Sequence, residues 1–85
     1  METSAARLQH RQVEITGSRV GAQKVSATQA IREYSFLGLA DAKHAIDKVL
    51  DGSPVTIEAR GEQAALDLAR ALEQLNFIVG PAPRD

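Results

Sequence analysis

Apolar and polar residues alternate in some segments of the chain, and in others apolar residues recur every three or four positions. Alternation is the pattern of a half-buried strand, because successive side chains of a strand point to opposite faces of a sheet. In residues 11–16 it places Val13 and Ile15 on one face, and we expect Gly17 and Ser18 to end this strand. The same pattern predicts two further strands, at residues 54–58 and 77–79.

The helical pattern predicts two helices between the first and second strands. Residues 22–34 contain no Pro or Gly, and Ala27, Ile31 and Tyr34 recur at helical spacing. The second helix spans residues 39–50 and is followed by a glycine and a proline, which commonly stop helices. Its apolar stripe consists of Leu39, Ala42, Ile46, Val49 and Leu50.

A third helix is predicted between the second and third strands. It begins around residues 60–62, and we expect Leu66 to widen its buried face. Asn76 follows the helix and can adopt the left-handed backbone that often ends one. The apolar stripe of this helix consists of Ala65, Leu68, Ala69, Leu72 and Leu75.

The order of these elements predicts an α+β fold, a two-layer β-α-α-β-α-β domain. Helices and sheet each have one apolar side to bury, so we expect a three-stranded sheet with three helices packed on one face. A chain of 85 residues has room for one core. We assign the domain to residues 12–80 and predict flexible tails at residues 1–11 and 81–85.

Composition narrows the functional classes. Hydrophobic residues make up 44% of the chain, so it can bury a core, and the absence of cysteine excludes disulfides and thiolate chemistry. With a net charge of −1, the chain lacks the excess of basic residues that is typical of nucleic-acid-binding proteins, so we expect no direct nucleic-acid binding. No apolar run approaches the roughly 20 residues of a membrane span. We therefore expect a cytoplasmic protein that does not contact membranes.

The sequence offers no recognisable catalytic or metal site. His10 lies in the predicted tail, and nothing near His44 supplies the four or so ligands of a zinc site. Asp47 and Asp51 are one helical turn apart, but such a pair is usually a solvated helix face. Phosphate-binding and nucleophile motifs of the GxxxxGK[ST], GxGxxG and GxSxG types are absent. We expect a non-enzymatic protein without metal or cofactor.

A candidate binding surface lies on the first two helices. Lys24, Thr28 and Arg32 are spaced four residues apart, so they stack along one side of the first helix. If the two helices form a hairpin, these side chains and a lysine of the second helix surround an apolar turn, an arrangement that suits protein docking. The surface consists of Lys24, Thr28, Arg32, Leu37, Gly38, Leu39 and Lys43.

The apolar turn at residues 37–39 has a second interpretation. The periodicity of the chain, taken alone, favours this second interpretation over a binding surface. In that interpretation Leu37 and Leu39 both belong to the core. The charged residues around them are then ordinary surface residues, which rarely need a functional explanation.

Four motifs resemble a known family, the C-terminal domain of the bacterial ribosomal stalk protein. They are QKV at 23–25, AIRE at 30–33, LGLADAK at 37–43 and DGSPV at 51–55. The resemblance covers roughly residues 12–80 and includes the order of elements. It implies the same fold and a protein-interaction module that docks translational GTPases, such as elongation factors Tu and G and initiation factor two, or the ribosome.

The resemblance also implies contact residues, because the family binds its partners through the first two helices. Matched by motif, the contacts fall on Lys24, Arg32, Gly38, Leu39 and Lys43. In the family the glycine of this set lets the chain turn sharply between the helices.

Some positions of the docking surface depart from the family pattern. Thr28 stands where the family has an apolar residue, and Gln29 and Ala40 stand where it has lysines. Phe36 replaces the first glycine of the family's Gly-Leu-Gly-Leu turn. These changes alter about half of the contact set, so the resemblance implies weakened docking.

Two alternatives to the docking module remain open. One is a peptide-binding adaptor resembling the Clp protease adaptor, although residues 17–20 lack the acidic groups of that family. The other is a diverged paralogue that forms a homodimer through the apolar turn. Residues 1–11 cannot replace the stalk family's dimerisation domain, so we expect a stand-alone domain that is a monomer or a weak homodimer.

Overall fold

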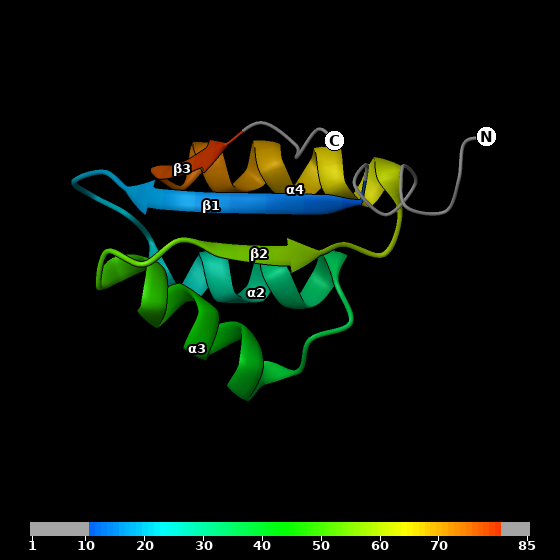
Figure 1. The fold of residues 1–85 in the computed structure, drawn as a ribbon, viewed down its shortest axis with the longest axis horizontal. Helices are drawn as coiled ribbons and strands as arrows, with labels where there is room; N and C mark the ends of the chain where they lie inside the picture. Colours follow the sequence, from blue (N-terminus) through cyan, green and yellow to red (C-terminus); the bar gives the residue numbers. More distant parts are fainter. Residues whose placement is uncertain (1–10, 81–85) are drawn as a thin grey trace.

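A computed structural model describes residues 11–80 of the protein (Figure 1). The tails predicted at residues 1–11 and 81–85 lie outside this range, except for Arg11, whose carbonyl accepts a 2.7 Å hydrogen bond from the Ala59 N–H. The predicted α+β order of elements is confirmed. The elements are β1 (Gln12–Ser18), α2 (Lys24–Tyr34), α3 (Leu39–Leu50), β2 (Val55–Glu58), α4 (Glu62–Gln74) and β3 (Phe77–Gly80).

The three strands form an antiparallel sheet in the order β2-β1-β3. In the central strand β1, Val13 lies opposite Ile57, and Ile15 lies opposite Val55 on one side and Val79 on the other. These apolar pairs face the helices, because Val13, Ile15 and Ile57 are all buried. Cross-strand apolar pairing therefore sets the register of the sheet.

Strand β1 is longer than its sequence suggests. The prediction that Gly17 and Ser18 end the strand is wrong, because both residues pair with β3. The register shifts between Ile15 and Gly17, as in a β-bulge, and beyond the shift pairing resumes with Ile78 and Phe77. The partner strand thus provides hydrogen bonds that keep the glycine in the sheet.

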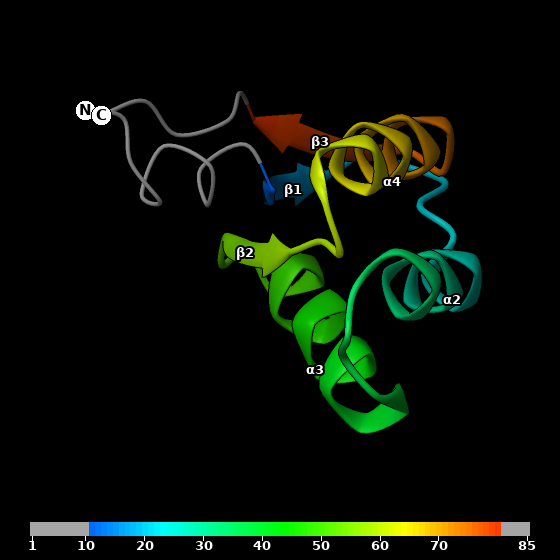
Figure 2. The same ribbon diagram turned by 90° about the vertical axis from the view of Figure 1, so that its right-hand side faces the viewer.

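All three helices lie on the same side of the sheet (Figures 1 and 2). Helices α3 and α4 contact the strands, and α2 packs against both of these helices. Residues from every layer meet in one core, whose largest fully buried members include Phe77, Ile15, Ile31, Ile46, Leu68 and Leu72. The core fixes α2 against α3, and these two helices carry the candidate site.

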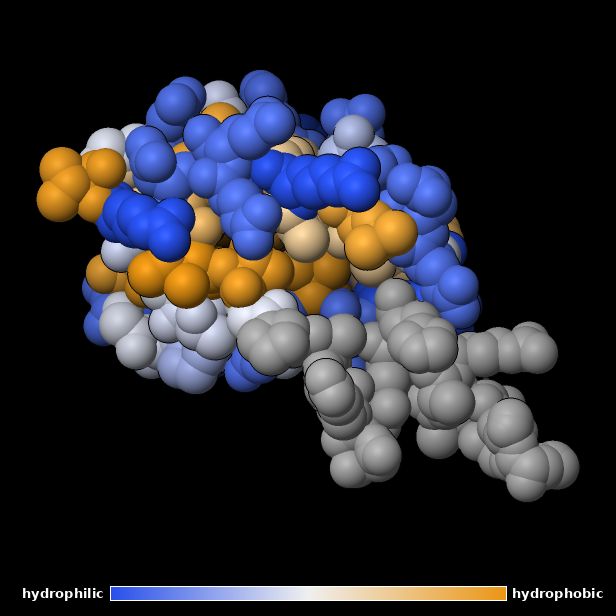
Figure 3. All heavy atoms as spheres, turned by 90° about the horizontal axis from the view of Figure 1, so that it is seen from above, coloured by the Kyte–Doolittle hydropathy of each residue, from blue (hydrophilic) through white to orange (hydrophobic). Residues whose placement is uncertain are grey.

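The expectation that Leu66 widens the buried face of α4 is wrong. Leu66 is 53% exposed, whereas Leu68 of the same helix is fully buried. Seen from above in Figure 3, apolar residues form a band over α4 and β3. The band contains a shallow hollow of about 130 Å³ lined by Gln12, Val13, Ala65, Leu66, Ala69, Val79 and Gly80.

The turn after α4 holds the beginning of α2. Asn76 has the predicted left-handed backbone, with φ of 71°. Its side-chain amide donates a 3.1 Å hydrogen bond to the carbonyl of Gly21, and its carbonyl accepts one of 2.8 Å from the Arg19 N–H. The Gln23 N–H donates to the carbonyl of Leu75 at 3.1 Å. The connection that leads into α2 is therefore fixed immediately before Lys24.

Candidate functional site: a groove between two helices

A groove of about 370 Å³ is formed by α2 and α3. It gathers residues that are far apart in sequence, because the core packs the two helices side by side. Among the residues of the predicted surface, it includes all except Leu37 and Gly38. The groove is lined by Lys24, Val25, Thr28, Gln29, Arg32, Leu39 and Lys43.

The groove exposes apolar side chains from both helices. Val25 of α2 is 70% exposed and Leu39 of α3 is 55% exposed. Large exposed apolar residues grouped in one hollow are typical of a contact surface rather than of scattered surface composition. A partner's apolar side chain that enters the groove would remove both residues from water.

Thr28 lies between the two helices rather than on an open helix surface. The stripe of Lys24, Thr28 and Arg32 suggested exposure, yet Thr28 is only 6% exposed because α3 packs against this side of α2. Its hydroxyl donates a 2.9 Å hydrogen bond to the carbonyl of Lys24. Since that bond satisfies the hydroxyl within the helix, Thr28 contributes mainly packing to the groove.

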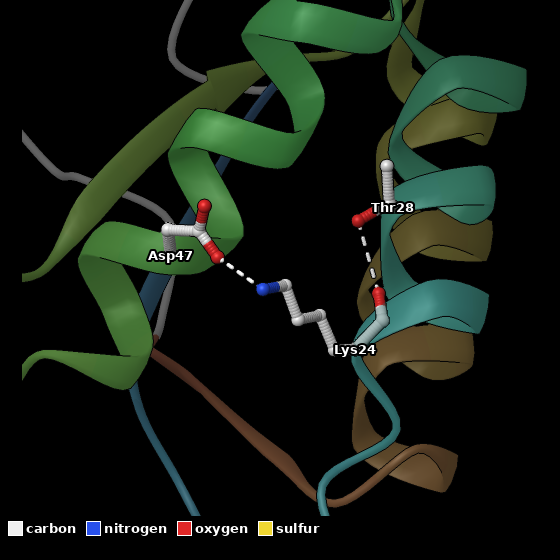
Figure 4. A network of polar contacts seen from close by, with 3 residues as sticks. All are labelled: Lys24, Thr28 and Asp47. Atoms are coloured by element: carbon white, nitrogen blue, oxygen red, sulfur yellow. Dashed lines mark hydrogen bonds and ion pairs between the residues drawn. The ribbon is translucent and has the colours of Figure 1, made fainter.

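An ion pair joins the two helices beside the groove. Nζ of Lys24 lies 2.7 Å from Oδ1 of Asp47, as Figure 4 shows, and both side chains are 44% exposed. The hydrogen bond from Lys24 lowers the pKa of Asp47 below its usual value, against the opposing effect of desolvation. The charges of Lys24, Lys43 and His44 lower the pKa of Asp47 further.

The other two cations of the groove, Arg32 and Lys43, have no carboxylate within salt-bridge distance among residues 11–80. Both side chains belong to residues that are exposed. The groove therefore combines three cations with exposed apolar residues, and Asp47 engages one of the cations. Such a surface favours an acidic partner with an apolar contact residue.

The apolar turn is neither wholly core nor wholly surface. Leu37 is half-buried and packs against the core, and its N–H donates a 3.2 Å hydrogen bond to Oγ of Ser35. Leu39 instead lines the groove. Gly38 immediately precedes α3 and has an extended backbone (φ −81°, ψ −177°), which does not require glycine. Each interpretation of the turn thus holds for one of the two leucines.

Phe36 lies outside the groove. It is 75% exposed, and the guanidinium carbon of Arg60 lies 4.6 Å from the centre of its ring. This distance is typical of a cation–π contact. Phe36 and Leu37 line a separate hollow of about 280 Å³ with Thr56, Ile57 and Glu58 of β2.

Two residues at the groove, Val25 and Asp47, were missed as candidates in the sequence. Val25 is one helical turn before Gln29, which the family pattern already placed on the docking surface, so its position gave a usable signal. Asp47 was assigned to a solvated face together with Asp51. Its contact with Lys24 depends on how two helices pack, so no local spacing predicts it.

Two further features are absent from residues 11–80. This range contains no group of three or more His, Asp or Glu residues arranged to hold a metal ion. None of its helices is long and apolar enough to cross a membrane.

Comparison with known proteins gives a relative that matches most of the chain. No protein-family model matches the chain. Over 67 residues it is 30% identical to large ribosomal subunit protein bL12 of Clostridium novyi (strain NT). The chain resembles the bacterial ribosomal stalk protein.

The similarity to bL12 covers 78% of this chain and 52% of the relative, so the chain spans about half the length of that protein. It confirms the resemblance inferred from the four motifs. It also connects the chain with ribosomal proteins and translation. The named relative bL12 is a ribosomal protein and not an enzyme.

Proposed function

We propose that the protein is a non-enzymatic interaction module that docks a translational GTPase through the α2–α3 groove. The observation that carries the proposal is that five positions implied by the sequence line one hollow. These positions are Lys24, Thr28, Arg32, Leu39 and Lys43. The resemblance to bL12 supports a role of this kind in translation.

The physical properties of the groove fit such a role. Exposed Val25 and Leu39 provide apolar area, and Arg32 and Lys43 provide positive charge beside it. Charge of this kind speeds encounter with an acidic surface, and burial of the apolar residues holds the complex together. Binding is therefore expected to weaken as salt concentration rises.

The groove has less positive charge than the family pattern implies. Gln29 lies in the groove at a position where the family has lysine, and Asp47 engages Lys24. The expected complex is transient, with the protein acting in the cytoplasm near the ribosome. Contact with nucleic acid or membrane is not part of the proposed role.

A binding assay with purified bacterial elongation factors tests the proposal. The double variant Lys24→Glu/Leu39→Asp changes one cation and one apolar residue of the groove. A matched control is Arg70→Glu/Leu66→Asp, which makes the same kinds of change at exposed positions of α4. We expect the first variant to lose binding and the second to keep it. Equal loss in both variants, or no binding by the unmodified protein, contradicts the proposal.

A further inference from the structure

Asp47 is the acidic residue that contacts a cation of the groove. Its carboxylate oxygen lies 2.7 Å from Nζ of Lys24, which lines the groove at the first residue of α2 (Figure 4). No other ion pair of Lys24 is found within residues 11–80. A partner carboxylate that approaches Lys24 therefore meets an ammonium group that already has an anionic neighbour.

The groups around the pair hold Asp47 in its charged form. Lys24 faces it from α2, while Lys43 and His44 act on it from its own helix. The pair is only partly exposed on each side, and its N···O distance is that of a charge-assisted hydrogen bond. Asp47 is thus a carboxylate of the protein itself, and it occupies the position at Lys24 where a carboxylate of the partner would bind.

We infer that Asp47 is a specificity-determining residue that competes with the partner for Lys24. The inference rests on the proposed function of the groove and adds the chemistry of the partner. The matching partner segment has an apolar side chain for Val25 and Leu39 and more than one carboxylate. One carboxylate takes the place of Asp47 at Lys24, and another meets Arg32 or Lys43.

Competition of this kind selects strongly acidic partners over weakly acidic ones. A segment with a single carboxylate gains little at Lys24, because it only exchanges one anion for another. A segment with several carboxylates also reaches Arg32 and Lys43, which have no carboxylate partner among the described residues. An exposed pair is worth little, so removing Asp47 should tighten binding only about two- to fivefold.

The test compares Asp47→Asn with Asp51→Asn in binding to a purified bacterial elongation factor. Both variants remove one negative charge from the second half of α3 or its C-cap. Asp47 contacts Lys24 of the groove, whereas Asp51 at the C-cap has no ion pair with a groove cation among residues 11–80. We expect Asp47→Asn to bind about two- to fivefold more tightly than the unmodified protein, with a steeper salt dependence. Asp51→Asn should change affinity less.

A double-mutant cycle with Lys24→Gln separates competition from general charge. If Asp47 acts through Lys24, the gain from Asp47→Asn disappears when Lys24 is already Gln. An equal gain in Asp51→Asn, a gain that persists in the Lys24→Gln background, or no gain at all overturns the inference. Asp47→Ala provides a second variant, and circular dichroism confirms that each variant is folded.

The outcomes also distinguish this inference from the proposed function. If Lys24→Glu/Leu39→Asp abolishes binding while Asp47→Asn has no effect, the groove docks the factor and only the competition is wrong. If neither the unmodified protein nor Asp47→Asn binds any elongation factor, both proposals fail.

Discussion

Lys24 and Asp47 join α2 to α3 through an ion pair of 2.7 Å. The pair has two separable roles. It connects the helices that form the groove, which affects stability, and it engages a cation of the groove, which affects binding. Because both side chains are substantially exposed, we expect the structural role to be modest.

The pH dependence of stability tests the structural role of the pair. Lys24 lowers the pKa of Asp47 in the folded state below its ordinary value of 3.8. A depressed folded pKa stabilises the protein above the unfolded pKa, and this contribution is lost as pH falls through the folded pKa. The unfolding free energy of the native protein should therefore exceed that of Asp47→Asn at neutral pH.

Urea unfolding of both proteins measured from neutral pH to below the pKa of Asp47 checks this prediction. The difference between the two proteins should be constant near neutral pH, should begin to shrink as pH approaches 3.8, and should level off only below the lowered pKa of folded Asp47. A difference that stays constant to the acid limit would mean that ionisation of Asp47 has no part in it.

Substitutions of two leucines in α4 test the assignment of the core. Leu68 is fully buried and Leu66 is 53% exposed. Leu68→Ala should reduce the unfolding free energy by about 2–5 kcal/mol, because it leaves a cavity. Leu66→Ala should cost about 0.5 kcal/mol or less, as surface substitutions usually do. Chemical denaturation gives both values, and similar losses would contradict this orientation of α4.

Asn76 provides a test of how the fold positions the groove. Its backbone is left-handed, and its amide bonds to the carbonyl of Gly21 in the connection that leads to α2. Asn76→Gly loses the amide bond but tolerates this backbone, whereas Asn76→Ala loses the bond and adds strain of about 1–2 kcal/mol. The alanine variant should therefore have the lower melting temperature. Equal melting temperatures would show that backbone strain at residue 76 is unimportant.

Two lysine substitutions distinguish the groove from the wider helix surface. The family pattern has lysine at the positions of Gln29 and Ala40, but the structure places only Gln29 in the groove lining. Gln29→Lys should tighten binding to an elongation factor several-fold and steepen its salt dependence. Ala40→Lys adds the same charge outside the lining, so its effect should be smaller. Titration of both variants at several salt concentrations measures this, and a larger gain from Ala40→Lys would mean that the contact surface lies elsewhere.

Local patterns in the sequence predicted the elements well where a single segment determines the outcome. Residues 39–50 are helical as expected, and Gly52 and Asn76 both have the left-handed backbone that ends a helix. The strand β1 was predicted too short, because pairing with β3 across a register shift keeps Gly17 and Ser18 in the sheet. A glycine suggests the end of a strand when its own segment is considered alone, but it does not reveal the hydrogen bonds that a partner strand provides.

The site shows the same division between local and long-range effects. Motif spacing identified Lys24, Arg32, Leu39 and Lys43, which do line one groove. The burial of Thr28 and the pairing of Asp47 with Lys24 both depend on how α3 packs against α2. Neither therefore follows from spacing within one helix. Leu66 shows the reverse case, since an apolar residue at suitable spacing remains exposed.

The most direct test of the docking groove is a map of amide chemical shifts in the isotope-labelled protein as an unlabelled bacterial elongation factor is added. We predict saturable, salt-sensitive changes at the groove residues Val25, Gln29, Leu39 and Lys43, with little change along the exposed face of α4. Changes centred on α4 and β3, or no changes at concentrations that saturate a known stalk domain, would contradict docking through the groove.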